Sequence, residues 1–221
     1  QECKADIGIA FDGDGDRLGV VTELGEMIFP DQLMMIFAKD VLAKYPRSKI
    51  IFDVKCSNLL AEIIETAGGE AIMSPTGHFH IKNALKKSGA PLAGEMSGHI
   101  FFNDQWYGFD DGHYSAFRLL EIIAKQNKPL ADMFKNLPKA FSTPEINIDV
   151  LESRKFSIVD DFIQKSSFDN GEKVTIDGLR VNFQDGWGLL RASNTTPKLV
   201  LRFEAQTSER LDEIQKLFLD Q

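Results

Sequence analysis

Short apolar runs and helix-period patterns alternate along the first part of the chain. Runs of strand length cover residues 6–11, 17–22, 49–54, 71–73 and 91–93. Patterns with one apolar helical face cover residues 30–42, 57–67, 81–87 and 113–124. This alternation predicts an α/β domain with a mixed, mostly parallel sheet and helices on both faces.

The pattern changes after Pro138. From Glu145 onward it predicts a strand, a helix, several strands and a final helix that begins at Ser208. The strands before that helix are expected over residues 173–176, 179–183, 187–192 and 199–205. This order predicts a smaller α+β domain, joined near residues 138–145. We therefore expect three parts: residues 1–26 as the end of a truncated α/β domain, residues 27–138 as an α/β domain, and residues 139–221 as the α+β domain.

The first strand is expected to lie inside a domain. Residues 6–11 read Asp-Ile-Gly-Ile-Ala-Phe and follow closely on Gln1. A strand this apolar normally has neighbours on both sides and helices on its faces. No upstream segment of this sequence supplies them, and there is neither an initiator Met nor a targeting segment. The sequence therefore predicts a fragment that begins inside a domain.

Composition excludes several classes of protein. Hydrophobic residues make up 43% of the 221 residues, too many for a disordered tail, and no apolar run approaches the length of a membrane span. The net charge of −8 makes the chain a poor binder of nucleic acid or anionic membrane, because both need a positive field. Anion binding would need a local basic pocket. The two cysteines, Cys3 and Cys56, suit a reducing cytoplasm.

The strongest chemical signal follows the first strand. Asp12, Asp14 and Asp16 alternate with glycines and are followed by Arg17. Glycines permit a sharply curved backbone, so the three carboxylates can converge on one point. Convergent carboxylates repel one another unless a cation lies between them, and hard oxygen ligands select Mg²⁺ or Ca²⁺. We expect Mg²⁺.

Two other interpretations of the acidic loop compete with a magnesium site. A helix-loop-helix calcium loop would place Asp12, Asp14, Asp16 and Glu23 at its first, third, fifth and twelfth positions. Its sixth position requires Gly but is Arg17, and the preceding segment has a strand pattern instead of a helical one. A solvated acidic turn is the other alternative, and it explains so dense a cluster less well.

Lys55 and His78 are candidates for proton transfer or charge stabilisation. Each lies in a loop where a predicted strand ends and a helix begins, the edge at which open α/β sheets bind ligands. A surface lysine in a turn explains Lys55 about as well, and a single loop histidine is more often incidental than catalytic.

The segment Gly94-Glu-Met-Ser-Gly-His99 carries a second group of polar side chains. Glu95, Ser97 and His99 alternate, so an extended backbone would turn all three to one side. Carboxylate and hydroxyl groups in that arrangement can bind the vicinal hydroxyls of a sugar. A Ser-His hydrolase site is a poor alternative, because the Gly-x-Ser-x-Gly elbow is absent from this segment.

A phosphate site is expected near the C-terminus. The segment Arg191-Ala-Ser-Asn-Thr-Thr-Pro197 combines a guanidinium with small hydrogen-bonding side chains, namely Ser193, Asn194 and Thr195. Together with backbone N–H donors these groups can cradle a phosphate. Arg202 follows on the next predicted strand and adds a second positive charge. A polar hairpin turn would explain the small side chains but not the arginine beside them.

Taken together, these loops resemble those of the α-D-phosphohexomutase family, over essentially the whole chain and in the family's order. The matching stretches are the Asp12–Arg17 loop, Lys55, the Thr76-Gly-His78 loop, the Gly94–His99 segment and the Arg191–Pro197 segment. Met96 is similar to the phosphomannomutase/phosphoglucomutase branch, whereas phosphoglucosamine mutases tend to carry Gln there. Phe79 departs from the Ser that the family often has after the histidine.

The resemblance implies an enzyme that interconverts hexose 1-phosphates and 6-phosphates of mannose or glucose. It implies Mg²⁺ on Asp12, Asp14 and Asp16, with a hexose 1,6-bisphosphate as activator. Arg17, Lys55 and His78 would assist transfer, and Glu95, Ser97 and His99 would bind the sugar. Arg191, Ser193, Asn194, Thr195 and Arg202 would hold the phosphate that does not react. A hinge near residues 138–145 would let the last domain close over the ligand.

The family's Thr-x-Ser-His-Asn-Pro loop, whose serine carries the phosphoryl group, does not occur in these 221 residues. The resemblance therefore implies that the missing N-terminal domains are this chain's partner and that the chain alone is inactive. Rival hypotheses are a phosphosugar-binding module loaded with Ca²⁺ or Mg²⁺, and a phosphatase with Asp12 as nucleophile.

Overall fold

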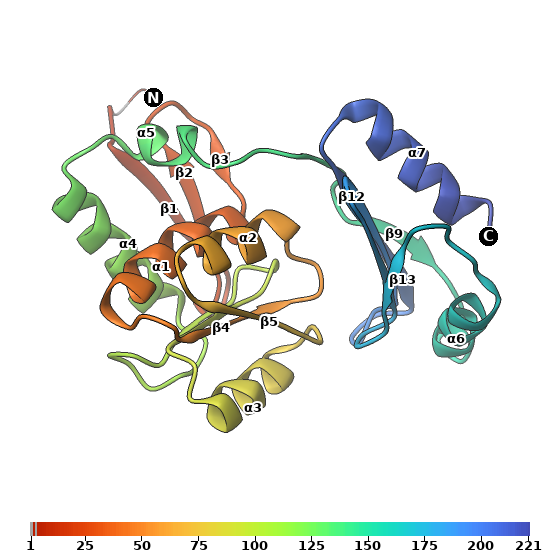
Figure 1. Ribbon diagram of the computed structural model, residues 1–221. Helices are drawn as coiled ribbons and strands as arrows, with labels where there is room; N and C mark the ends of the chain where they lie inside the picture. Colours follow the sequence, from red (N-terminus) through yellow and green to blue (C-terminus); the bar gives the residue numbers. More distant parts are fainter. Residues whose placement is uncertain (1, 3) are drawn as a thin grey trace. The chain divides into compact units, whose positions relative to one another are not determined.

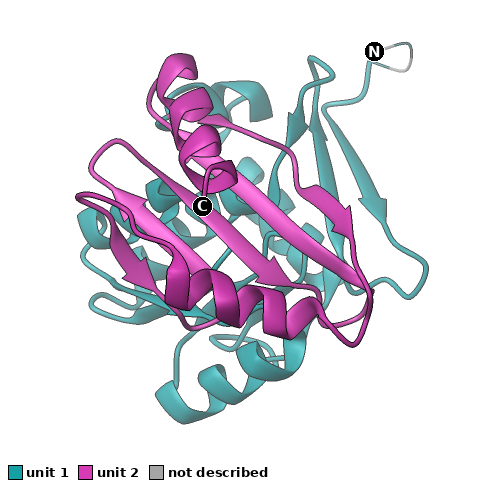
Figure 2. Ribbon diagram, turned by 90° about the vertical axis from the view of Figure 1, so that its right-hand side faces the viewer, with its two compact units in different colours: residues 1–138 teal, residues 139–221 magenta. Residues whose placement is uncertain are grey.

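The computed structural model describes residue 2 and residues 4–221; Cys3, considered above for the redox state, lies outside the described residues. The chain divides into two compact units, residues 1–138 and residues 139–221, coloured separately in Figure 2.

Unit 1 holds two sheets, both visible in Figure 1. The first is antiparallel and has the order β1-β2-β3, formed by Ile7–Phe11, Leu18–Thr22 and Met27–Ile28. The second has the order β5-β4-β6-β7, formed by Glu70–Ser74, Lys49–Asp53, Leu92–Gly94 and Ile100–Phe102. Strand β4 runs parallel to β5 and β6, and only β7 runs antiparallel, so the second sheet is mostly parallel, as predicted.

Helices cover both faces of the second sheet. The helices of unit 1 are α1 (Pro30–Lys44), α2 (Asn58–Thr66), α3 (His78–Ser88), α4 (Gly112–Gln126) and α5 (Leu130–Lys135). Successive strand residues point to opposite faces. Accordingly Ile51 packs in one core with Ile81 and Leu85 of α3, whereas its neighbours Ile50 and Phe52 pack in the core built with α1, α2 and α4.

The first strand forms where the pattern predicts it, but it is only partly buried. Strand β1 forms, but it pairs antiparallel with β2, and the described residues place no strand on its other edge. Only Ile7 and Ile9 are half-buried, and Phe11 is 40% exposed. The reason is that β1 belongs to a separate three-stranded sheet and has packing on one face only.

The small sheet and the larger one share a single hydrophobic core. Leu18, Val20 and Ile28 of the small sheet pack in the same cluster as Phe37 of α1 and Phe102 of β7. Strands β2 and β3, which lie before and after the domain boundary predicted at residues 26–27, thus contribute to one core. The expected division of the chain into three domains stays a prediction.

Unit 2 is a two-layer α+β structure. Its antiparallel sheet has the order β10-β11-β12-β13-β8, and β9 also pairs with β13. The elements are β8 (Phe141–Ser142), β9 (Ile146–Asp149), α6 (Lys155–Lys165), β10 (Glu172–Val174), β11 (Leu179–Phe183), β12 (Gly186–Ala192), β13 (Lys198–Ala205) and α7 (Ser208–Leu219). Both helices cover one face, where Val159 of α6 and Ile214 of α7 pack against alternate strand residues such as Leu190 and Leu201. The mixed α/β fold followed by an α+β fold is confirmed.

Phe218 is central to the core of unit 2. Its ring centroid lies 4.8 Å from that of Phe168 and 5.3 Å from that of Phe203. We predict that Phe218→Ala lowers the free energy of unfolding of unit 2 by about 3–5 kcal/mol, because it removes a buried ring and leaves a cavity. Urea unfolding followed by the fluorescence of Trp187 in a Trp106→Phe background reports this unit alone, since these are the two tryptophans of the chain.

The neighbouring Leu219 is 71% exposed, so Leu219→Ala is a matched control that should change the free energy by no more than about 0.5 kcal/mol. Equal unfolding midpoints for the two variants would contradict the packing described for α7.

Candidate functional site

The acidic loop between β1 and β2 brings its three carboxylates together. Asp12, Asp14 and Asp16 each offer one oxygen, and these oxygens all lie within 4.8 Å of one another. Gly15 adopts a φ of +79°, a backbone conformation that glycine tolerates readily. The convergence expected from the alternation of Asp and Gly is therefore present in the structure.

The loop rests on the N-terminus of α4. The N–H of Gly112 donates to the carbonyl oxygen of Gly15 over 3.1 Å. A Cβ at Gly112 would lie 2.8 Å from the carbonyl oxygens of both Gly15 and Arg17, so the absence of a side chain there is what permits this close approach. Gly112, the first residue of α4, thus fixes the position of the acidic loop against the start of that helix.

Arg17 and the local charges make the three carboxylates unequal. The Nε of Arg17 lies 2.5 Å from Oδ2 of Asp12, and the N–H of Arg17 donates to Oδ1 over 3.1 Å. Desolvation alone would raise the pKa of Asp12, but these hydrogen bonds and the Arg17 charge hold it well below its usual range. At Asp16, burial raises the pKa; His99 opposes the shift, and the charges of Asp12 and Asp14 add to it.

The donor set fits a hard divalent cation. Oδ1 of Asp16 is buried and has no hydrogen-bond partner among the described residues, although it is a strong acceptor. A cation beside the three carboxylates would satisfy this oxygen and relieve the repulsion that opposes ionisation of Asp16.

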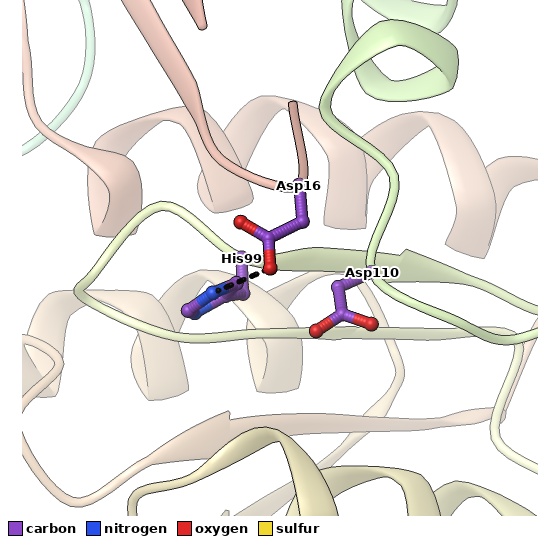
Figure 3. A group of neighbouring side chains, drawn as sticks. All are labelled: Asp16, His99 and Asp110. Atoms are coloured by element: carbon purple, nitrogen blue, oxygen red, sulfur yellow. Dashed lines mark ion pairs between the residues drawn. The ribbon is translucent and has the colours of Figure 1, made fainter. Parts of the chain in front are cut away.

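Asp16 also belongs to a second group, with His99 and Asp110, whose ligand atoms lie within 4.8 Å of one another. In Figure 3 the Asp16 carboxylate points toward the His99 ring, 3.4 Å from its Nε2, and Asp110 lies beside them. This second group includes a histidine nitrogen, whereas Mg²⁺ prefers oxygen ligands, and its Asp110 is also ion-paired with Lys82, whose Nζ lies 2.6 Å from Oδ1. The all-oxygen group of Asp12, Asp14 and Asp16 is therefore the better candidate for Mg²⁺.

The Gly94–His99 segment is a tight turn, and the expectation of an extended backbone there was wrong. The N–H of Glu95 donates to the carbonyl oxygen of His99 over 2.9 Å, and the N–H of Gly98, at a φ of +101°, donates to that of Glu95. The segment closes the β6–β7 hairpin, because β7 returns antiparallel to β6. The short hydrophobic run of β7 gave no periodic signal in the sequence.

The hairpin turn nevertheless brings Glu95, Ser97 and His99 together. Nδ1 of His99 lies 3.0 Å from Oε2 of Glu95 and 2.8 Å from Oγ of Ser97. Glu95 is buried, and its Oε1 accepts a hydrogen bond from the N–H of Gly77 at the start of α3. The three side chains cluster because they lie at the two ends and the tip of one turn.

The acidic loop and the hairpin turn are neighbours. The N–H of Leu18 donates to the carbonyl oxygen of Gly98 over 3.1 Å, and Arg17 forms an isolated antiparallel bridge with His99. The candidate metal loop and the candidate sugar loop are thus joined by backbone hydrogen bonds within unit 1.

Lys55 and His78 lie at the same edge of the sheet. They follow the carboxyl ends of the parallel strands β4 and β5. Lys55 is buried, with its Nζ 4.0 Å from Oδ2 of Asp53. Nδ1 of His78 lies 3.1 Å from Oδ2 of Asp110, and its ring centroid lies 6.2 Å from that of His99.

Two residues of this region, Asp110 and Asp53, are not among those predicted from the sequence. In the sequence, Asp110 and Asp111 together have the pattern of a helix cap and turn. Only Asp111 caps α4, by accepting from the N–H of Tyr114, whereas Asp110 binds His78 and Lys82. A helix needs only one acidic residue as its cap. The second of two adjacent acids before α4 was therefore the available signal that one of them has another role. Asp53, the last residue of β4, carries no signal in the sequence that sets it apart from the rest of the strand.

The candidate phosphate loop connects β12 and β13 in unit 2. Oγ of Ser193 accepts hydrogen bonds from the N–H of Thr196 and from its hydroxyl, over 3.2 and 2.8 Å, which curls the loop. Asn194 and Thr195 are exposed at its tip. Arg191 and Arg202 project from the same face of the β12–β13 pair, because Arg191 pairs with Val200, two residues from Arg202.

Arg191 has donor capacity to spare. Its Nε is paired with Oδ2 of Asp177 at 2.9 Å, while its buried Nη2 has no partner among the described residues. A buried donor without an acceptor is unfavourable, so an anion at this position would be stabilised.

No helix in the described part of the chain is long and apolar enough to cross a membrane.

Comparison with known proteins covers the whole chain. Residues 29–141 match the family described as phosphoglucomutase/phosphomannomutase, alpha/beta/alpha domain III, and residues 145–221 match the C-terminal domain of the same family. A phosphomannomutase/phosphoglucomutase of Pseudomonas putida is 54% identical over 221 residues, 100% of this chain and 48% of its own length. A phosphoglucomutase of Neisseria meningitidis is 56% identical over 97% of this chain and 47% of its own length.

A crystal structure of a phosphoglucomutase/phosphomannomutase family protein from Burkholderia thailandensis aligns with a TM-score of 0.92 at 52% identity. The alignment covers 98% of this chain and 46% of that one. The chain thus spans about half the length of the relatives it matches.

The contacts of His99 predict a raised pKa for this residue. Burial of the imidazole lowers the pKa, but the hydrogen bond and charge of Glu95, with the charges of Asp16 and Asp110, outweigh burial and raise it above 6.5. We expect Glu95→Gln to lower the pKa of His99, as measured by NMR titration of its ring protons in the presence of EDTA. Glu209→Gln, an exposed substitution on α7, is the matched control and should leave that pKa unchanged.

The same pair should make stability depend on pH. Because the folded-state pKa of His99 is raised, its contribution is fully present below pH 6.5 and is lost as the pH rises through the folded-state pKa. A titration midpoint of His99 at or below 6.5 would contradict the Glu95–His99 contact.

Proposed function

Because the chain belongs to the phosphoglucomutase/phosphomannomutase family, we propose that it supplies the metal loop, the sugar-binding turn and the phosphate loop of a phosphohexomutase. The reaction interconverts the 1-phosphate and the 6-phosphate of a hexose, mannose or glucose. The observation that carries the proposal is the backbone link between Leu18 and Gly98, which sets the Asp12–Arg17 loop beside the Glu95–His99 turn.

The phosphoryl donor in this proposal is a phosphoserine on residues outside the 221 of this chain. A sugar hydroxyl oxygen attacks the phosphorus and the P–O bond to serine breaks. A base takes the proton of the sugar hydroxyl, and the departing serine oxygen receives a proton in return. The resulting hexose bisphosphate then returns its other phosphoryl group to the serine. Atoms and charges balance without any further reactant, and the 221-residue chain alone is expected to be inactive.

Phosphoryl transfer depends on positioning and charge neutralisation more than on covalent help from the protein. Asp12, Asp14 and Asp16 would hold Mg²⁺, which supplies positive charge to the phosphoryl oxygens when bound. The guanidinium of Arg17, fixed against Asp12, adds positive charge beside the same loop. The net charge of the chain is −8, so its overall field does not attract phosphate and local cations would have to supply that attraction.

Lys55 and His78 are the proposed groups for proton transfer or for stabilising developing charge. His78 is oriented by Asp110, whose carboxylate lies against Nδ1 and so leaves Nε2 as the outward nitrogen. Lys55 is held in a buried position next to Asp53, which limits the ways in which its ammonium can point.

Sugar recognition is assigned to the hairpin turn. Glu95 and Ser97 would bind the 3- and 4-hydroxyls, and His99 would contact the sugar or its nearby phosphate. The Met96 side chain is partly buried and packs against the unit 1 core. Its influence on the choice of hexose would therefore act through the shape of the turn.

In unit 2, Arg191, Ser193, Asn194 and Thr195 are proposed to bind the non-reacting phosphate, with Arg202 adding positive charge. The spare Nη2 of Arg191 and the curled loop support this assignment.

The activity is tested on the complete polypeptide, including the residues upstream of Gln1. With Mg²⁺ and hexose 1,6-bisphosphate, we expect conversion of mannose 1-phosphate and glucose 1-phosphate to the 6-phosphates, and loss of that conversion in EDTA. Turnover of glucosamine 1-phosphate alone would refute the branch inferred from Met96. Irreversible release of inorganic phosphate would indicate a phosphatase, and binding without turnover would indicate a phosphosugar-binding module.

The phosphate loop predicts a specific defect. Arg191→Ala in the complete enzyme should raise the KM for the hexose phosphate by about tenfold or more, because a hydrogen bond to a charged group contributes about 1.5–3 kcal/mol. Arg154→Ala, an exposed arginine of the same unit, is the matched control and should leave KM unchanged. Steady-state kinetics check both, and an unaltered KM for Arg191→Ala would remove the loop from the substrate site.

A further inference from the structure

Asp53 is a fully buried carboxylate that none of the assignments above uses directly. It is the last residue of β4, and its exposed fraction is 0%. Strand β4 lies between β5 and β6 and runs parallel to both, so its carboxyl end adjoins the loops that follow its two neighbours. Asp53 therefore stands at the centre of the edge where the candidate residues gather.

The contacts of Asp53 reach three different loops. Oδ1 accepts from the N–H of Met96, in the hairpin turn, over 3.1 Å. Oδ2 accepts from the hydroxyl of Thr76, two residues before His78, over 3.0 Å, and lies 4.0 Å from Nζ of Lys55. The thiol of Cys56 donates to Oδ1 over 3.1 Å. Each loop touched by Asp53 carries a residue assigned to sugar binding or to transfer.

A carboxylate in this position is unfavourable for folding by itself. Burial raises the pKa of Asp53, and the charge of Lys55 opposes that shift. The desolvation of a buried ion costs several kcal/mol, and an apolar residue of similar size would avoid that cost. What the carboxylate provides is the simultaneous orientation of donors from three loops.

We propose that Asp53 is a positioning residue of the transfer reaction. It fixes the ammonium of Lys55, the Thr76–His78 loop and the Glu95–Ser97 turn relative to one another, so that sugar-binding and transfer groups meet the substrate in one arrangement. Asp53 itself does not touch the substrate. This inference rests on the proposed phosphohexomutase function and assigns a further residue to the same site.

The test is Asp53→Asn in the complete enzyme. The amide keeps one acceptor oxygen but removes the negative charge beside Lys55 and places an NH₂ group among donors. We expect kcat to fall at least tenfold. Asp104→Asn is the matched control, because the Asp104 side chain is likewise 0% exposed and is ion-paired with Arg118, while its hydrogen bonds and ion pairs among the described residues are to Arg118 and not to the three loops. It should lower the melting temperature and leave kcat within about twofold.

Double-variant kinetics separate positioning from a general loss of stability. If Asp53 acts through Lys55 and the hairpin turn, then Asp53→Asn should cost much less kcat in a Lys55→Ala or Ser97→Ala background than in the wild type. A purely structural role would reduce kcat by the same factor in every background. The proposal would be overturned if Asp53→Asn reduced kcat by the same factor in the Lys55→Ala and Ser97→Ala backgrounds as in the wild type.

Thr76 provides a second test if Asp53→Asn does not fold. Thr76→Val removes one hydrogen bond to Asp53 while keeping the side-chain shape, and should lower kcat severalfold, whereas Thr76→Ser should restore it. Full kcat in Asp53→Asn or in Thr76→Val, with an active wild type, overturns this inference alone. An inactive wild type overturns the proposed function and this inference with it.

Discussion

The concentration of carboxylates at one edge of unit 1 is the constraint on which the site depends. Six acidic side chains gather there: Asp12, Asp14, Asp16, Asp53, Glu95 and Asp110. Several have their own cationic neighbour, since Arg17 pairs with Asp12, Lys55 with Asp53, His99 with Glu95 and Lys82 with Asp110. This pairing leaves the negative charge least compensated in the acidic loop, where Oδ1 of Asp16 has no hydrogen-bond partner among the described residues and lies 3.8 Å from Nε of Arg17.

The topology of the sheet explains how groups so distant in sequence come together. Parallel strands expose their carboxyl ends at a common edge, and β4 brings Asp53 and Lys55 between the loops that follow β5 and β6. The antiparallel return of β7 then folds the Glu95–His99 segment back toward the acidic loop. A small sheet, β1-β2-β3, delivers the acidic loop to the same place because Leu18 and Val20 share the unit 1 core.

Local chemistry made some of these features predictable from sequence. Alternating Asp and Gly indicated the converging carboxylates, and Ser57 indicated the start of α2, where its hydroxyl accepts from the N–H of Leu59. The elements with clear periodicity, such as α1 and β13, lie where the pattern placed them. The two-residue and three-residue strands β3, β7 and β8 are too short to carry a period, and α5 is a helix of only six residues.

Other parts of the site depend on contacts that no local pattern encodes. The clustering of Glu95 with His99 arises from a turn, which became visible only once β7 was known to pair with β6. Asp53 binds Thr76 and Met96, which lie 23 and 43 residues away, and Asp110 binds His78, 32 residues away, as well as Lys82. A buried acid is conspicuous only when its burial is known, because in sequence it resembles the polar end of any strand.

The charge balance of the chain also bears on the candidate anion site of unit 2, where arginines are held on a sheet. A chain of net charge −8 attracts no phosphate by its overall field, so the attraction must be local. Arg191 and Arg202 project from one face of the β12–β13 pair, and Asp177 fixes Nε of Arg191 while Nη2 keeps its capacity to donate. A guanidinium that is oriented but not saturated loses little rotamer freedom when it binds an anion. In unit 1 the charges are reversed. Arg17 is paired with Asp12 and thereby orients the loop, while Oδ1 of Asp16 has no hydrogen-bond partner among the described residues and could accept a cation. In each unit one ion pair holds the geometry of the candidate site, and one buried atom without a hydrogen-bond partner among the described residues indicates the charge of the ligand that the site would favour.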